Sequence, residues 1–407
     1  MRRVVITGMG IVSCLGHRLE DVARALFEGK PGITYVEDYA RRGLRSCVAG
    51  IPRYDDEISI ERRLRRFMSD TALYAYHATR SAIADAGLPR ATITSPRTGL
   101  IVGSGTGSPL EIVEVIKNYT ANGAARMPPY EIPRIMSSTT SANLVTAFGI
   151  RGTSYSLTSA CATSAHAIGH GAELIQSGKQ DCVIVGGAEE VSWICTLLFD
   201  AMHALSTGFN DRPLEASRPY DRRRDGFVIA GGAGILILEE RDSALARDAR
   251  IYGELLGYAA VSNGGDMVIP DVDGAARTMQ LALDQAGVEV DYVNTHATST
   301  RIGDITELEA IRKIFGSRIP PLSSTKGLTG HPIAAAGVHE AIYCLLMLQH
   351  HFLAGCANLD EPDEATDGLP LVVTSRHTPV NTIMSNSFGF GGTNASLVFR
   401  RWSTKEK

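Results

Sequence analysis

The stretch SLTSACATSAHAIGHG, residues 156–171, joins a β-prone segment to a pattern rich in small side chains. From Cys161 onward, small or apolar residues recur at helical spacing, at Ala165, Ile168 and Ala172. The pattern predicts a helix that begins at or near Cys161. A thiol there faces unsatisfied N–H groups and the positive end of the helix dipole, which favour a thiolate and can receive an oxyanion. Cys161 is therefore either a nucleophile or a small apolar core residue.

Short runs rich in Val and Ile alternate with helical patterns along the rest of the chain. The runs that predict strands cover 97–107, 181–190, 231–240, 290–300 and 382–399. Helical spacing is clearest in 70–87 and 336–351. This alternation predicts an α/β layered fold, although no internal repeat is recognisable in the sequence.

Composition excludes several classes of protein. The chain has 407 residues, 44% hydrophobic and 21% charged, with a net charge of −4, so nothing favours a nucleic-acid partner. No run of 18 apolar residues exists, and we therefore expect no membrane span. Seven cysteines without a CxxC pair argue against a disulfide framework and against a metal site. A reducing, cytoplasmic compartment is expected.

The N-terminal run VVITGMGIVS suggests an alternative function. Gly8, Gly10 and Ser13 come close to the dinucleotide-binding fingerprint, and Asp38 follows where a ribose-binding acid would stand. A nicotinamide-dependent oxidoreductase is therefore the alternative from another class of enzyme. A secretory signal is not expected, because glycines break the apolar run and a globular pattern follows it.

Two histidines follow strand-like runs far downstream of the cysteine. His296 lies in the turn NTHATST, and His331 follows Lys326 in the loop STKGLTGH. Side chains at the carboxyl ends of strands in an α/β sheet meet at the edge where such folds bind ligands. The sequence therefore favours a site that combines Cys161 with both histidines.

Five ordered motifs carry a resemblance to a known family: SACATSAH, RDGFVIAGG, NTHATST, STKGLTGH and MSNSFGFGGTNA. Through these motifs, nearly the whole chain resembles the condensing enzymes known as β-ketoacyl-[acyl carrier protein] synthases, of the elongating, type I kind. The resemblance implies a thiolase-like fold, in which two similar α/β halves form five layers, αβαβα. The halves are expected at 1–248, with the cysteine, and 249–407, with the histidines, and the enzyme is expected to be a homodimer.

The resemblance also implies a reaction, the decarboxylative Claisen condensation that lengthens an acyl chain by two carbons in fatty acid biosynthesis. Cys161 would take the acyl chain from a carrier-protein thioester. His296 and His331 would hold the carbonyl of the malonyl donor while it loses CO2. The oxyanion on the acyl thioester would be received by the N–H groups of Cys161 and Phe390.

Supporting residues are implied in the same way. Gly389 and Gly391 beside Phe390 would allow a close backbone approach and the mobility of a gate. Lys326 would order the site together with Glu307 through a hydrogen-bond network. The residues expected along the pantetheine arm are Thr298, Thr300 and Phe388. The two threonines have a simpler alternative, hydroxyls that cap a turn.

The partner implied by the family is an acidic acyl carrier protein, whose phosphopantetheine carries the acyl and malonyl groups, so no separate cofactor is expected. Arg63 and Arg66, in the run ERRLRRFM, match positions of carrier contact, and a basic patch would steer that partner. The alternative for this run is a basic helix that is merely solvated. Two further alternatives are a specialised polyene or polyketide pathway with the same chemistry, and a non-catalytic subunit of a heterodimer, against which the retained Cys161 argues.

Two departures from the usual motifs lie beside the histidines. Ala297 follows His296 where many members have glycine, and Pro332 follows His331 where serine is usual. Neither change removes a functional group, but both bear on the shape of the pocket. Acyl chain length cannot be predicted from the sequence.

Overall fold

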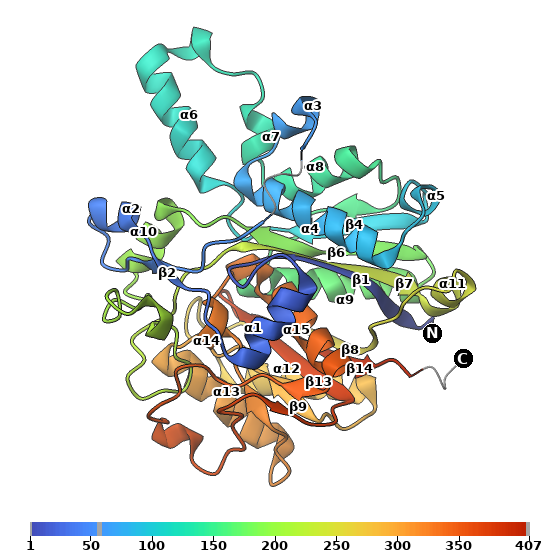
Figure 1. Cartoon of the computed structure of the whole chain (residues 1–407), viewed down its shortest axis with the longest axis vertical. Coiled ribbons are helices and arrows are strands. Elements are labelled where there is room, and N and C mark those ends of the chain that lie inside the picture. Colours follow the sequence, from blue (N-terminus) through green and yellow to red (C-terminus); the bar gives the residue numbers. More distant parts are fainter. Residues whose placement is uncertain (1, 55–58, 404–407) are drawn as a thin grey trace.

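Ten strands form one continuous mixed sheet in the computed structural model, which describes residues 2–54 and 59–403 (Figure 1). The strands lie in the order β10-β9-β13-β14-β8-β1-β7-β6-β4-β5. Their bounds are β1 Val4–Val12, β4 Thr98–Gly103, β5 Ser154–Tyr155, β6 Cys182–Glu189, β7 Gly232–Glu240, β8 Gly253–Ser262, β9 Tyr292–Asn294, β10 Leu322–Ser323, β13 Thr382–Gly389 and β14 Thr393–Arg401. Each run predicted as a strand contains one, and 382–399 holds the hairpin of β13 and β14.

The two halves of the sheet have the same topology. Numbered from one to five within each half, the strands β1, β4, β5, β6 and β7 lie in the order 3-2-4-5-1, and so do β8, β9, β10, β13 and β14. In each half, strands two, three and four are parallel, whereas four, five and one are antiparallel. The first strands, β1 and β8, pair with each other and join the halves. The predicted duplication is confirmed. The two halves share their strand order although no repeat is recognisable in their sequences.

The helices cover both faces of this sheet. Their bounds are α1 Leu19–Glu28, α2 Glu37–Arg41, α3 Arg62–Arg65, α4 Asp70–Ala86, α5 Arg90–Ile93, α6 Pro109–Asn122, α7 Glu131–Ile135, α8 Thr139–Phe148, α9 Thr163–Gln176, α10 Trp193–Ala201, α11 Arg241–Ala246, α12 Val272–Ala286, α13 Arg301–Phe315, α14 Lys326–Thr329 and α15 Ala336–His350. Two small strand pairs lie apart from the main sheet: β2 Thr34–Tyr35 with β3 Val48–Ala49, and β11 Phe352–Leu353 with β12 Arg376–His377.

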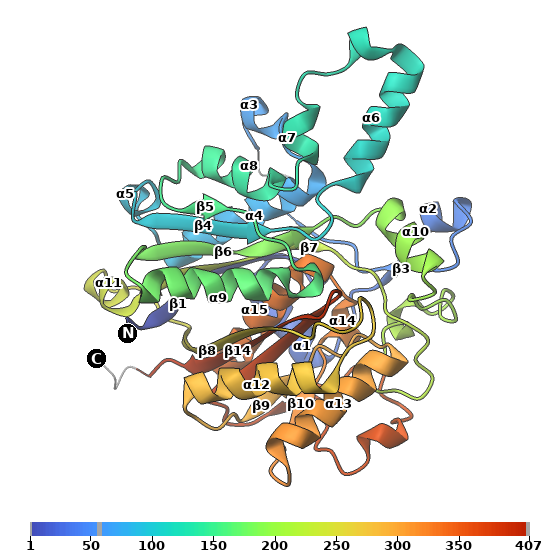
Figure 2. The same ribbon diagram turned by 180° about the vertical axis from the view of Figure 1, so that it is seen from behind.

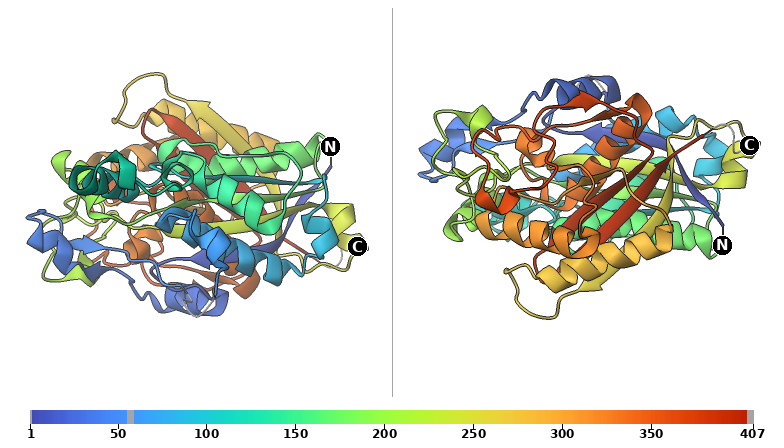
Figure 3. Two further views of the ribbon diagram at one scale, coloured as in Figure 1. Left: turned by 90° about the horizontal axis from the view of Figure 1, so that it is seen from above. Right: turned by 90° about the horizontal axis from the view of Figure 1, so that it is seen from below.

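The layers follow the predicted αβαβα arrangement. Helices α4 and α8 cover the outer face of the first half, and α9 and α15 lie between the halves (Figure 2). The view from below in Figure 3 shows α12 and α13 across the outer face of the second half. Each central helix joins the third and fourth strands of its own half, so α9 and α15 occupy equivalent places. Their N-termini, preceded by Cys161 and His331, therefore approach one common site.

Gly8 and Gly10 serve packing rather than cofactor binding. Both lie inside β1, whereas the dinucleotide fingerprint needs them in a turn between strand and helix. A Cβ on Gly10 would lie 2.0 Å from the carbonyl oxygen of Ala78, and one on Gly8 would lie 2.5 Å from that of Ala82. Helix α4 fills the space that a dinucleotide would need, so the oxidoreductase alternative has no structural basis at this motif.

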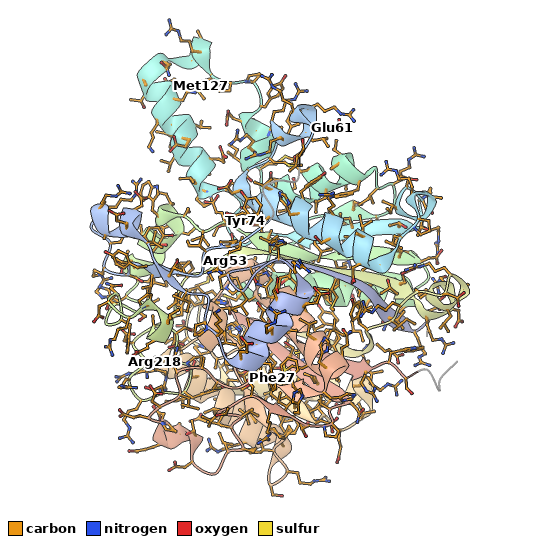
Figure 4. The ribbon with its side chains drawn as sticks, in the orientation of Figure 1. Phe27, Arg53, Glu61, Tyr74, Met127 and Arg218 are labelled. Atoms are coloured by element: carbon orange, nitrogen blue, oxygen red, sulfur yellow. The ribbon has the colours of Figure 1, made fainter. Side chains whose placement is uncertain are left out.

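The segment from α6 to α7 projects from the body of the molecule, with Met127 near its tip (Figure 4). It exposes large apolar side chains, namely Ile112, Ile116, Tyr119 and Ile132.

Among the described residues, no helix has both the length and the apolar character needed to cross a membrane.

Candidate active site

A cavity of about 400 Å³ lies where the N-termini of α9 and α15 meet the carboxyl ends of β9 and β13. The predicted site residues that line it are Cys161, His296, Thr298, Thr300, Glu307, His331, Phe388, Gly389 and Phe390. Phe227, which lies in the motif RDGFVIAGG, also lines it and packs edge-on against His331. Segments that are far apart in the sequence thus build one site.

Cys161 lies in a short 3-10 helix, Ala160–Ala162, which leads directly into α9. The preceding residue, Ala160, has a φ of 50°, a left-handed conformation that is uncommon for residues other than glycine. This sharp entry into the helix leaves the thiol at the cavity, as predicted. The backbone N–H of Phe390, just after β13, and the backbone N–H of Cys161 itself both donate hydrogen bonds to the sulfur.

The two histidines surround the sulfur. His331 Nε2 lies 2.9 Å from Cys161 Sγ, and the ring of His296 stands perpendicular to that of His331 at 5.2 Å between centroids. One ligating atom of each of the three residues lies within 4.8 Å of the others, a spacing that also suits metal ligands. The predicted Cys-His-His set is therefore assembled by the fold.

Backbone contacts hold both histidines in place. The His331 N–H donates to the Val228 carbonyl at 2.8 Å, and its own carbonyl accepts from the Ala230 N–H at 3.1 Å. His296 depends on Glu307, which comes from α13. The Glu307 carboxylate accepts from the backbone N–H groups of His296 and Ala297, each at 2.9 Å. Ala297 therefore presents its N–H as glycine would.

Both histidines of the site are neutral imidazoles at rest. Burial lowers the pKa of His296 and His331 well below the usual range, and the charge of Lys326 lowers both further. Burial raises the pKa of the Cys161 thiol to about 12, although Lys326 and the N–H of Phe390 lower it. Burial and the N–H groups at the helix N-terminus thus act on the pKa of the thiol in opposite directions. A thiol and two neutral imidazoles face the cavity.

The network that joins Lys326 with Glu307 stays a prediction: the charge of Lys326 lowers the pKa of Glu307, but no direct hydrogen bond joins the two among the described residues. The ammonium of Lys326 is paired instead with the carboxylate of Glu340, on α15, and both side chains are almost fully buried. Glu307 is occupied by the His296 loop and by the side-chain amide of Asn386 at 3.0 Å. Glu340 was not predicted as a partner, because it comes from a helix that nothing in the local motif indicates.

Replacing Lys326 with methionine is expected to lower the free energy of unfolding by about 3–5 kcal/mol, because Glu340 would keep a buried charge without its cation. Denaturant titration would measure this loss. The double variant Lys326→Met/Glu340→Leu should regain most of it, since no charge is then left buried. As a control, Lys313→Met removes the exposed pair with Asp273 and should cost no more than about 1 kcal/mol. An equal loss in both single variants would contradict the assignment.

The turn after β13 brings backbone against the cysteine. A Cβ on Gly389 would lie 2.8 Å from the Ser159 carbonyl oxygen, so only glycine lets the strand end approach this closely. Gly391 and Gly392 have φ angles of 80° and 69° and turn the chain into β14. Phe390 stands at the mouth of the cavity with 37% of its surface exposed. Gly391 does not line the cavity among the described residues. Its left-handed φ instead shapes the turn between β13 and β14.

Thr298 and Thr300 lie in the loop between β9 and α13. Their hydroxyl oxygens are 3.1 Å apart and both residues line the cavity. Thr300 stands at the N-cap position of α13, yet its side chain makes no capping hydrogen bond. The capping alternative is therefore not supported for Thr300. Phe388 also lines the cavity, edge-on to His296 at 6.0 Å between centroids.

Arg63 and Arg66 lie away from the residues that line the cavity. Arg63 forms an exposed pair with Glu61, and Arg66 stacks on Phe67 and Tyr130. Figure 4 shows Glu61 in the upper part of the molecule, whereas Arg218, next to the Thr298–Thr300 loop, lies in the lower half. Neither arginine lines the cavity of the described chain.

Comparison with known proteins identifies the family. Residues 1–244 match the model of the β-ketoacyl synthase N-terminal domain, and residues 252–360 match that of the C-terminal domain. The chain is 50% identical over 405 residues to 3-oxoacyl-[acyl-carrier-protein] synthase 1 of Haemophilus influenzae, covering 99% of this chain and 100% of that protein.

Solved structures agree in fold. The crystal structure of a β-ketoacyl synthase from Burkholderia phymatum is 36% identical with a TM-score of 0.93, covering 99% of this chain and 100% of that one. A ketosynthase structure described as AntDE:AntF, a type II polyketide synthase carrier protein in complex with its ketosynthase, is 28% identical with a TM-score of 0.90 and the same coverage. The predicted thiolase-like architecture and the condensing chemistry are thereby confirmed, and the chain belongs to the β-ketoacyl synthase family.

Proposed function

We propose that this ketosynthase condenses an acyl group held on Cys161 with malonyl-[acyl carrier protein], lengthening the acyl chain by two carbons. The observation that carries the proposal is the distance of 2.9 Å between His331 Nε2 and Cys161 Sγ, with His296 beside them in one cavity. The 50% identity to a 3-oxoacyl-[acyl-carrier-protein] synthase places this chemistry in fatty acid elongation, rather than in the polyketide pathway of the 28% relative.

The first step transfers the acyl group to the enzyme. The Cys161 sulfur attacks the thioester carbonyl of the acyl carrier protein, and its proton passes to His331 Nε2, the adjacent base. The N–H groups of Cys161 and Phe390 already point at the sulfur and receive the carbonyl oxygen as it becomes negative. The bond to the pantetheine sulfur then breaks, and that sulfur leaves with the proton. An acyl thioester remains on Cys161.

The second step makes the carbon nucleophile from the malonyl thioester. As CO2 leaves, its bonding electrons form an enolate whose oxygen lies between His296 and His331. Each neutral imidazole donates to this oxygen from Nε2, and burial together with Lys326 keeps both rings neutral. Because His331 accepts the cysteine proton at Nε2 in the first step, its resting proton must move from Nδ1 to Nε2 before the second step. The enolate carbon attacks the acyl group, the C–S bond to Cys161 breaks, and the thiolate that is released takes up a proton from water. The product leaves on the carrier protein.

Several features support a carrier protein as the partner. The curated relative is named for that substrate, and the AntDE:AntF structure holds a ketosynthase with its carrier protein. Thr298, Thr300 and Phe388 are proposed to contact the pantetheine arm where it enters the cavity. Because the arm belongs to the substrate, the reaction proposed here needs no separate cofactor and no metal. Phe390, with its flanking glycines, is proposed as the gate.

Changing Arg63 and Arg66 to glutamate should raise the KM for carrier-bound substrates by roughly tenfold and leave small acyl thioesters nearly unaffected, because only the acidic carrier depends on the patch. Arg63 is the cleaner position, since Arg66 also stacks on Tyr130. Steady-state kinetics with both substrate types would measure the effect. Arg318→Glu, a reversal of an exposed charge beyond α13, is the control. An equal loss with both substrates would mean that the patch is structural.

We also propose that the enzyme is a cytoplasmic homodimer. Within each chain, we propose that the N-terminal half ends at residue 248 and the C-terminal half begins at residue 249. The described cysteines are all free thiols, which supports a reducing compartment. The exposed apolar side chains of α6 and the open edge at β5 support a second copy as their cover. The proposed division lies between α11 and β8, and this connection leads from the first half of the sheet into the second.

Intact-protein mass spectrometry is the direct test of the function. The wild-type enzyme is incubated with acyl carrier proteins of several chain lengths and then with malonyl carrier protein. A mass gain of one acyl group, followed by release of a product two carbons longer, would establish the elongating condensation and its chain preference. No acyl adduct with any chain length would overturn the proposal and favour a non-catalytic subunit.

A further inference from the structure

Glu189 is a fully buried carboxylate that the reaction above does not use. It ends β6, and its side chain accepts hydrogen bonds from the loop that follows β4. These come from the backbone N–H groups of Gly105 and Thr106, at 2.9 and 3.2 Å, and from the hydroxyls of Ser104 and Thr106. It also accepts from the N–H of Ala334, at 3.4 Å, in the opposite half of the chain.

No cation pairs with this carboxylate among the described residues, so hydrogen bonds alone compensate its burial. Burial raises the pKa of Glu189, whereas the donors of Thr106, Gly105 and Ala334 lower it. A Cβ on Gly105 would lie 2.7 Å from the carboxylate oxygen, so the loop is fitted closely around it. Such a group is costly to bury unless each donor is held in place.

The Ala334 N–H belongs to the turn that follows His331. This turn is the 3-10 helix Ile333–Ala335, which leads into α15. Ile333 has a φ of 43°, a strained conformation for a β-branched residue. Its side chain packs in the same cluster as Cys161 and Phe227. Backbone strain of this kind persists only where surrounding contacts hold it, and Glu189 supplies one of them.

The duplicated topology gives this contact a counterpart. In the second half, the fourth strand β13 ends against the 3-10 helix of Cys161, and it delivers the Phe390 N–H to the sulfur. In the first half, the fourth strand β6 ends against the 3-10 helix that follows His331, and it delivers Glu189. Ala160 and Ile333 start the two 3-10 helices with similar left-handed φ angles, 50° and 43°. The fourth strand of each half thus contacts the 3-10 helix next to the reactive residue of the other half.

From this geometry we propose that Glu189 is a positioning residue, which holds the strained Ile333 turn and thereby the imidazole of His331 for stabilising the enolate. The proposal rests on the proposed function, because it assigns Glu189 to the decarboxylation step. It predicts an effect through His331 and not through His296, which is held separately by Glu307.

The experiment measures malonyl decarboxylation by Glu189→Gln, whose amide cannot accept from all of these donors. We expect kcat to fall by about tenfold or more, as a shifted imidazole would cause, with KM for the malonyl thioester within about twofold. Glu190→Gln is the matched control: this neighbouring buried carboxylate accepts from the Leu110 N–H at the start of α6, away from His331. Thermal unfolding of both variants gives the structural cost of losing a buried carboxylate.

The decisive comparison places Glu189→Gln in two histidine backgrounds. If Glu189 acts through His331, the substitution should change little when His331 is already alanine, and should retain its full effect when His296 is alanine. A similar loss in both backgrounds, or a loss equal to that of Glu190→Gln, would overturn the proposal. If Glu189→Gln does not fold, Thr106→Val removes one hydroxyl donor and should show the same pattern at smaller size. A wild-type enzyme without decarboxylation would instead refute the proposed function itself.

Discussion

Cys161→Ala is expected to abolish acylation and condensation, by at least about a thousandfold, because no other nucleophile replaces the attacking atom. Malonyl decarboxylation should persist within about tenfold of wild type, since both imidazoles that receive the enolate remain. Intact mass after incubation with acyl carrier protein reports acylation, and release of CO2 from malonyl carrier protein reports decarboxylation. The variant thereby separates two steps that share one cavity.

Cys182→Ala is the matched control for this variant. Cys182 is a buried thiol on β6 that does not line the cavity of the described chain, so its loss tests the cost of removing a sulfur from the core. Acylation should then stay near wild type. An acyl adduct that forms normally in Cys161→Ala, or one that is lost equally in Cys182→Ala, would contradict the role of Cys161.

His296→Ala and His331→Ala should each slow decarboxylation by about 10²–10³-fold, the usual loss when one donor to a developing oxyanion is removed. The measurement is cleanest in the Cys161→Ala background, where no acyl transfer interferes. The two variants should differ in acylation. His331→Ala should slow it because Nε2 lies 2.9 Å from the sulfur, whereas His296→Ala should leave it within a few-fold.

His377→Ala is the control for the histidine variants, because this residue lies on the surface strand β12 and packs against Phe27. It should decarboxylate at the wild-type rate. Decarboxylation at that rate in either His296→Ala or His331→Ala would exclude the enolate role of that histidine. Equal acylation in the two variants would exclude His331 as the base.

The site residues that carry chemistry were predictable because they lie in short motifs at the ends of regular elements. Cys161 precedes a helix whose small side chains are visible in the sequence, and His296 directly follows a strand run. The same local rules predicted α4 and α15 nearly to their ends, because each keeps its apolar residues at helical spacing.

Contacts between distant segments were not predictable in this way. The choice of Glu340 over Glu307 as the partner of Lys326 depends on where α15 lies relative to α14. Glu189 has no distinguishing signal in the sequence, because a carboxylate at the end of a strand is ordinary and the five donors that converge on it come from both halves of the chain. The pKa shifts of Cys161 and the two histidines were not predictable either, because burial depends on segments that are distant along the chain.

The amino-acid sequence indicates the α/β alternation, the motifs of the condensing enzymes and the three reactive side chains, because each depends on residues that are close along the chain. The packing of Gly8 and Gly10 against α4 and the pairing of Lys326 with Glu340 could be read only from the three-dimensional structure. Those outcomes depend on which surfaces meet when the sheet forms. The physical reason is that packing, burial and charge compensation are properties of neighbours in space, and the order of residues along the chain does not specify them locally.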